Sequence, residues 1–172
     1  MPGDKEKSVA IPIIGVCQII ASIVFIGLVG KRYTDEVGKF EKINTFGSLL
    51  AGLLVTTTGI IGILSQFCGN INLVIFNIFC PVALSVTAVA GWIFSVDIQR
   101  CLPQGFFNSA LICPYDKSQR DLNIAILAFS IACCLLSLIG LIVATYLITT
   151  RLNAKISAST VAPAGAPAVV TF

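Results

Sequence analysis

The sequence contains no histidine, and charged residues make up only 11% of its 172 positions. Without histidine, Ser-His-Asp and Cys-His catalysis and all zinc sites that use histidine are excluded. There is also no glycine-rich phosphate loop with a Lys-Ser or Lys-Thr pair after it. The carboxylates lie only outside the long apolar runs, with no sign of an enclosed pocket. We therefore predict that the protein is not an enzyme and has no catalytic residues, no metal site and no cofactor.

The shortage of charge is matched by a high apolar content. Hydrophobic residues account for 56% of the chain. Charged residues account for only 11%, whereas about a quarter of the residues in a soluble domain are charged. A water-facing surface cannot be assembled from so few polar side chains, so lipid is expected to surround much of the protein. The formal net charge of +3 is small and scattered, which argues against a nucleic-acid partner.

Runs without charge predict four membrane-spanning helices. Residues 8–30 form a run of 23 uncharged residues, which reaches about 34 Å and so crosses a hydrocarbon core of about 30 Å. A run of 54 residues at 43–96 would be about 81 Å long as one helix, so it must turn back. The best turn signal inside it is Cys-Gly-Asn at 68–70. The uncharged residues at 122–150 supply the last span.

These runs predict an all-α fold, an integral membrane four-helix transmembrane bundle. We expect an N-terminal tail at 1–8, a transmembrane domain at 9–150 and a disordered C-terminal tail at 151–172. The spans are placed at about 9–29, 44–67, 71–95 and 122–150, joined by a charged loop at 31–42, a tight turn and a loop at 97–121. The first span has no small-residue cleavage pattern after it, so we expect it to stay as an anchor rather than leave as a signal peptide.

Two observations disagree about orientation. Lys and Arg number four on the side of the termini and seven on the side of the two longer loops, which by the positive-inside rule puts the loops in the cytoplasm. However, Cys101 and Cys113 are separated by 11 residues in one polar loop and suit a disulfide, which persists on the oxidising side. We give the disulfide more weight and expect a multi-pass plasma-membrane protein with both termini cytoplasmic.

Small side chains recur at a spacing of four in the predicted spans, which places them on one helix face. In lipid, such residues allow helix backbones to approach closely. Packing within the bundle and an interface with a partner both explain this pattern. The residues concerned are Ser48, Gly52 and Thr56 in the second span and Ala83, Thr87, Gly91 and Ser95 in the third.

Three further residues are candidates for modification or contact. Cys68, at the inner boundary of the predicted topology, is either a palmitoylation site or a plain interfacial cysteine. Phe106 and Phe107 lie between the two loop cysteines and are candidate partner contacts. The same two rings could instead rest against the membrane interface, where aromatic side chains are common.

Several short stretches resemble a known family. They are Gly15-Val16-Cys17-Gln18-Ile19, the Gly- and Ser-containing segment 59–65, Asp97 followed by Cys101, and the paired loop cysteines. They are similar to the membrane-spanning four-domains subfamily A family, whose first span carries a Gly-x-x-Gln-Ile stretch. The resemblance implies cytoplasmic termini, a disulfide in the second outer loop, close-packed oligomers, and roles in signalling, trafficking or channel modulation. The charged first loop and the short termini depart from that layout.

Together these features predict a non-catalytic protein that acts by lateral association, as an oligomeric organiser or an accessory subunit of a receptor or channel. Its partners would be the lipid bilayer and either another membrane protein or further copies of itself. The alternative is a pore-forming channel subunit, with threonines of the second span lining the path. No Asp, Glu, Lys, Arg or His lies within the predicted spans, although ion-coupled transporters usually place such groups there.

Overall fold

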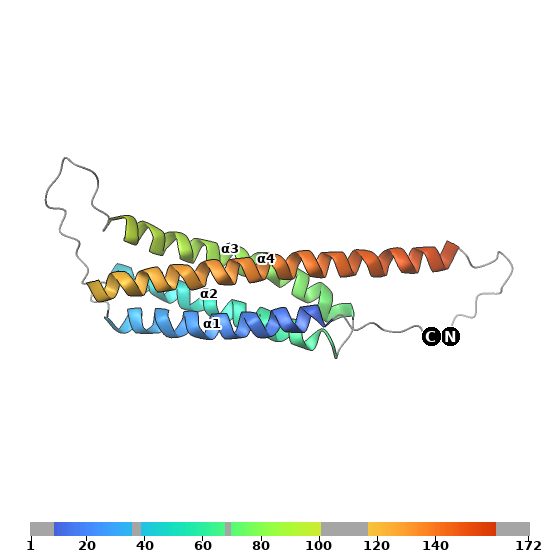
Figure 1. Ribbon diagram of the computed structural model, residues 1–172, viewed down its shortest axis with the longest axis horizontal. Helices are drawn as coiled ribbons and strands as arrows, with labels where there is room; N and C mark the ends of the chain where they lie inside the picture. Colours follow the sequence, from blue (N-terminus) through green and yellow to red (C-terminus); the bar gives the residue numbers. More distant parts are fainter. Residues whose placement is uncertain (1–8, 36–38, 68–69, 101–116, 161–172) are drawn as a thin grey trace.

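The computed structural model describes residues 9–35, 39–67, 70–100 and 117–160. Within these ranges the protein forms four helices and no strand: α1 (Ala10–Asp35), α2 (Lys39–Leu64), α3 (Asn70–Arg100) and α4 (Lys117–Thr160). The helices run side by side as an elongated bundle (Figure 1). The predicted all-α four-helix bundle is confirmed.

The bundle consists of two close helix pairs. α1 packs most extensively against α2, and α3 against α4, while smaller α1–α4 and α2–α3 contacts join the two pairs. In Figure 1, α3 lies obliquely across α4, and α4 projects beyond the other helices at the end where α1 begins. The 44 residues of α4 extend about 66 Å at 1.5 Å per residue.

Buried positions in every helix alternate between spacings of three and four residues, the pattern of left-handed helix packing. Many of these inward residues are small or polar, while large apolar side chains face outward. This arrangement suits a bundle in lipid, because lipid tails are as apolar as leucine and do not drive large apolar side chains inward. The residues of this repeat are Ile11, Gly15, Gln18, Ser22, Phe25, Val29 and Arg32 in α1; Thr45, Ser48, Gly52, Val55, Gly59 and Gly62 in α2; Leu73, Phe76, Cys80, Ala83, Thr87, Ala90 and Phe94 in α3; and Asn123, Ile126, Ser130, Cys133, Ser137, Gly140 and Ala144 in α4. Ala51, Thr58 and Gly91, each next to one of these residues, are also buried.

All four helices are long and apolar enough to cross a bilayer. The stretches that meet these requirements are Ala10–Thr34, Asn44–Leu64, Ile71–Gln99 and Ser118–Ser157. By length and composition, therefore, the chain is a multi-pass membrane protein with four spans.

All four helices run further than the sequence predicted at one end or at both. α1 ends at Asp35 rather than near 29, and α2 begins at Lys39 rather than near 44. α3 ends at Arg100 rather than near 95, and α4 spans 117–160 rather than 122–150. The first ten residues of the predicted disordered tail, 151–160, are thus helical. This segment contains Leu, Ala, Arg and Lys and lacks Gly and Pro, so its composition favours a helix. Charge marks where a helix leaves the hydrocarbon, but it does not end the helix.

Candidate functional site

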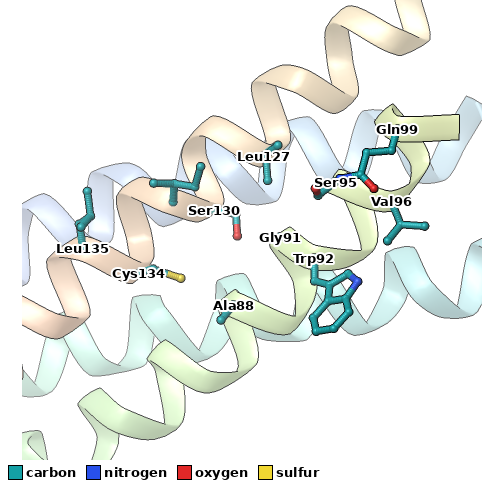
Figure 2. A pocket seen from close by; sticks show the side chains of 11 residues that line it. Ala88, Gly91, Trp92, Ser95, Val96, Gln99, Leu127, Ser130, Cys134 and Leu135 are labelled. Carbon is teal, nitrogen blue, oxygen red and sulfur yellow. The ribbon is translucent and has the colours of Figure 1, made fainter. Parts of the chain in front are cut away.

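A groove opens between α3 and α4 on the outer surface of the bundle, toward the end where α3 finishes (Figure 2). Its volume is about 570 Å³, which lies within the range of ligand pockets, about 300–1,000 Å³. On α3 the groove is lined by Ala88, Gly91 and Ser95, whose small side chains leave room beside the helix. Trp92 also lines the groove and is 71% exposed. The groove therefore combines a hollow with a large aromatic ring at its edge.

Polar groups beside the groove hold α3 and α4 together. Ser130 Oγ donates a hydrogen bond of 2.7 Å to the Thr87 carbonyl, and Thr87 Oγ1 lies 3.2 Å from Cys134 Sγ. Figure 2 shows Ser130 and Cys134 directed from α4 toward α3. The helices meet here because Gly91 has no side chain: a Cβ at that position would lie 2.7 Å from Ser130 Oγ.

The chemistry of this groove suits binding. A serine or cysteine nucleophile needs an adjacent general base or a lowered pKa. The residues that line the groove include no histidine and no carboxylate, and Ser130 already donates its proton to a backbone carbonyl. The groove offers a neutral, mostly apolar surface with a few hydroxyl and amide groups.

α1 and α2 meet along a line of glycines. A Cβ at Gly15 would lie 2.6 Å from the Gly59 carbonyl oxygen, and a Cβ at Gly59 would lie 2.6 Å from the Gly15 carbonyl oxygen. A Cβ at Gly52 would come within 2.5 Å of an α1 side chain. Across the same interface, the hydroxyls of Ser22 and Thr56 share a hydrogen bond of 2.8 Å. Only glycine therefore permits these two backbones to come so close.

Two polar side chains are buried between the helix pairs. Gln18 is 0% exposed, and neither atom of its amide has a hydrogen-bond partner among the described residues. The thiol of Cys80, which is also buried, lies near the Gln18 side chain. Ser137 is also buried, and its hydroxyl has no hydrogen-bond partner among the described residues. It lies about one helical turn before Gly140, which packs against Cys80. A buried polar group without a partner costs about 1–3 kcal/mol, so this layer weakens the bundle.

Arg32 differs from the sequence-based expectation. The sequence predicted a charged loop at 31–42, yet Arg32 belongs to α1 and is only 1% exposed. The inward spacing of α1 continues from Phe25 through Val29 to Arg32, which carries the guanidinium into the end of the bundle. Arg32 is therefore a helical, inward-facing residue and not part of a loop. The continuing spacing of four and three was the signal that could have revealed it.

The predicted packing residues divide between the interior and the groove. Gly52 and Thr56 contact α1, as described above. Thr87 and Gly91 contact α4, and Ser95 is half-buried along the groove. The other two, Ser48 and Ala83, are buried.

Five other candidate residues lie outside the described residues, so the disulfide, the lipidation and the aromatic contacts stay predictions. They are Cys68, Cys101, Phe106, Phe107 and Cys113. Among the cysteines that are described, Cys80 and Cys133 are buried, Cys134 is half-buried and Cys17 is exposed, all as free thiols. The same part of the chain holds no cluster of three or more residues that could bind a metal ion.

No family model matches this sequence, and neither does any curated protein or solved structure. The function must therefore be argued from the geometry of the two helix pairs and of the groove between α3 and α4.

Proposed function

We propose that this protein is a non-catalytic, four-span membrane protein that acts by lateral association, as an oligomeric organiser or an accessory subunit of a receptor or channel. The observation that carries the proposal is the groove between α3 and α4 with the exposed Trp92 beside it. Tryptophan is enriched among the few residues that supply most of the energy at protein interfaces. Small residues such as Ala88 and Ser95 are those that transmembrane helices place at close contacts.

The occupant that fits this groove is a transmembrane helix of a partner or of another copy. Its large side chains would fill the hollow left by Ala88 and Ser95, and Trp92 would cover one side of it. Hydrogen bonds to the hydroxyls would add little, since polar contacts between membrane helices average about 0.6 kcal/mol. Packing would supply most of the affinity.

The orientation and location form part of the proposal. Cytoplasmic termini at the plasma membrane would place the Cys101–Cys113 disulfide on the oxidising side, where disulfides persist. The resemblance to the membrane-spanning four-domains subfamily A family supports the same orientation, oligomeric assembly and a role in signalling.

The contacts of the threonines in α2 favour lateral association over a pore. Thr57 is exposed, and its hydroxyl donates 2.9 Å to the Leu53 carbonyl of the same helix. Thr58 is buried and donates 2.8 Å to the Leu54 carbonyl. Because these hydroxyls are satisfied within their own helix, they can face lipid or a packed interior and do not need a water-filled path.

A matched pair of substitutions on α3 tests the proposal. Ala88→Phe fills the groove, whereas Val89→Phe adds the same ring at the next position, which is 61% exposed and does not line the groove. Protein labelled with donor or acceptor dyes is reconstituted in liposomes, and association is measured by energy transfer, with co-purification for a foreign partner. We expect Ala88→Phe to weaken association at least about tenfold, equivalent to about 1.4 kcal/mol, and Val89→Phe to leave it unchanged. Equal behaviour of the two variants, or a wild-type protein that associates with nothing, would contradict the proposal.

A further inference from the structure

A second groove lies at the opposite end of the α3–α4 pair, where α4 leaves the bundle. Its volume is about 140 Å³, and it is lined by Leu73, Val74, Ile148, Arg151, Leu152 and Lys155. We propose that this groove binds an anionic phospholipid, with the phosphate of the headgroup at Arg151 and Lys155 and an acyl chain against Val74 and Ile148. The site is separate from the groove beside Trp92, and it does not depend on lateral association.

The two cations of this groove are arranged to grip one anion. Arg151 and Lys155 are four residues apart on α4, so their side chains lie on the same helix face. Both are exposed. A guanidinium can donate two parallel hydrogen bonds to a phosphate, and an ammonium adds a compact charge beside it. One headgroup can therefore meet both side chains.

The depth of the groove matches that of a lipid headgroup. Asp121 and Arg151 are 30 positions apart on α4, which corresponds to about 45 Å, the thickness of a bilayer with its headgroup regions. With Asp121 at one surface, Arg151 lies at the other. Ile148 is about one helical turn deeper than Arg151, and Val74, which is 45% exposed, lines the groove from α3. From the membrane interior outward, the groove presents apolar side chains first and cations second. The acyl chain and the phosphate of a lipid follow in the same order.

The described residues at this end of the bundle carry charge of one sign. Among the described residues, the acidic positions Asp35, Glu41, Asp97 and Asp121 all belong to the opposite end, near the loop-side ends of the helices. In the same ranges, Arg151 and Lys155 are the charged residues at the end where α1 begins. Anionic lipids concentrate in the cytoplasmic leaflet, so the site agrees with cytoplasmic termini.

Lipid retention by the full-length protein tests the inference. The protein is reconstituted in phosphatidylcholine bilayers with a minor fraction of phosphatidylserine, released in mild detergent, and weighed with its bound lipids by native mass spectrometry. We expect the wild type to retain phosphatidylserine in preference to phosphatidylcholine. Arg151→Gln with Lys155→Gln should reduce that preference about thirtyfold, since each basic residue near the surface contributes about fivefold. Arg151→Lys with Lys155→Arg keeps both charges and should retain most of the preference.

The control removes two cations from the other end of the molecule. Lys31 and Arg120 are both exposed there, and Lys31→Gln with Arg120→Gln should leave the preference unchanged. An equal loss in both double variants would mean general surface attraction and would overturn the site. Val74→Asn should weaken lipid retention while both cations remain. If it has no effect, or if inorganic phosphate alone displaces the lipid completely, the apolar floor plays no part and the assignment to a phospholipid is overturned.

Discussion

The α1–α2 and α3–α4 pairs use similar small residues in different ways. In the first pair glycine faces glycine, and the backbones of Gly15 and Gly59 approach closely enough to exclude any Cβ. In the second pair Gly91 faces the side chain of Ser130, and a hydroxyl-to-carbonyl bond of 2.7 Å crosses the contact. The α3–α4 pair also leaves the groove of about 570 Å³ beside this contact.

This difference separates a structural interface from a surface available for binding. Backbone-to-backbone contact leaves no adjustable group, so the α1–α2 pair should tolerate almost no change at its glycines. Contact through a serine side chain can adjust by rotation, so the α3–α4 pair should tolerate more. We therefore expect α1–α2 to determine whether the bundle forms and α3–α4 to determine what it associates with.

The largest expected effect is at Gly59. Gly59→Val would place side-chain atoms against the Gly15 carbonyl oxygen and the side chain of Ile19, and it should lower the free energy of unfolding by about 3 kcal/mol or more. Titration with sodium dodecyl sulfate, followed by circular dichroism, measures this loss.

Substitutions at two other glycines serve as comparisons for Gly59→Val. Gly27→Val should change the unfolding free energy by less than about 0.5 kcal/mol, because nothing beyond the adjacent backbone of α1 lies within 4 Å of a Cβ at that position. Gly91→Ala should fall between the two, at about 1 kcal/mol, since the group that it meets is the movable Ser130 hydroxyl. If Gly27→Val destabilises as much as Gly59→Val, intrinsic helix effects and not the close contact explain the loss.

The next substitution should increase the free energy of unfolding. Gln18→Leu removes a buried amide that has no hydrogen-bond partner among the described residues, so we expect the free energy of unfolding to rise by about 1 kcal/mol. The same titration detects this change. Gln99→Leu, on an exposed position of α3, should have little effect on stability. A clear loss of stability in Gln18→Leu would mean that the amide is hydrogen-bonded in the membrane, and the account of this layer would be wrong.

The smallest effect concerns the hydrogen bond between Ser22 and Thr56. A double-mutant cycle with Ser22→Ala and Thr56→Ala should give a coupling energy of about 0.6 kcal/mol, the average for polar contacts between membrane helices. Thr57→Ala serves as the control for Thr56→Ala, because the Thr57 hydroxyl donates to the Leu53 carbonyl of its own helix. A coupling energy of zero between Ser22 and Thr56 would show that their hydroxyls do not meet.

Much of the fold could be predicted from the sequence because the bilayer sets the length of each span. Runs without charge determine the number of helices, and the turn signal at 68–70 divides the longest run. The ends of the helices were harder to predict from the sequence. Arg32 and the segment 151–160 continue their helices although they carry charge. The first charged residue after an apolar run marks the boundary of the bilayer core. The helix itself ends where the local composition and packing change.

The groove could not be predicted from the sequence. A spacing of four identified Gly91 and Ser95 as interface residues, but it gave the same signal for Gly52 and Thr56, which pack against α1. Which small residues are covered depends on which helices become neighbours. That choice is a property of the whole bundle, so neither the hollow beside Trp92 nor the buried layer at Gln18 follows from one helix alone.

Photo-crosslinking from two aromatic positions tests lateral association through the α3–α4 groove most directly. A photoreactive phenylalanine analogue is placed at Trp92, beside the groove, or at Phe46, which is 55% exposed near the loop-side end of α2. Both variants are irradiated in the membranes in which the protein is expressed, and the products are separated by mass. If the groove binds a neighbouring protein, we expect a discrete protein adduct from position 92 and only lipid adducts from position 46. Only lipid adducts from both positions, or the same protein adduct from both, would contradict it.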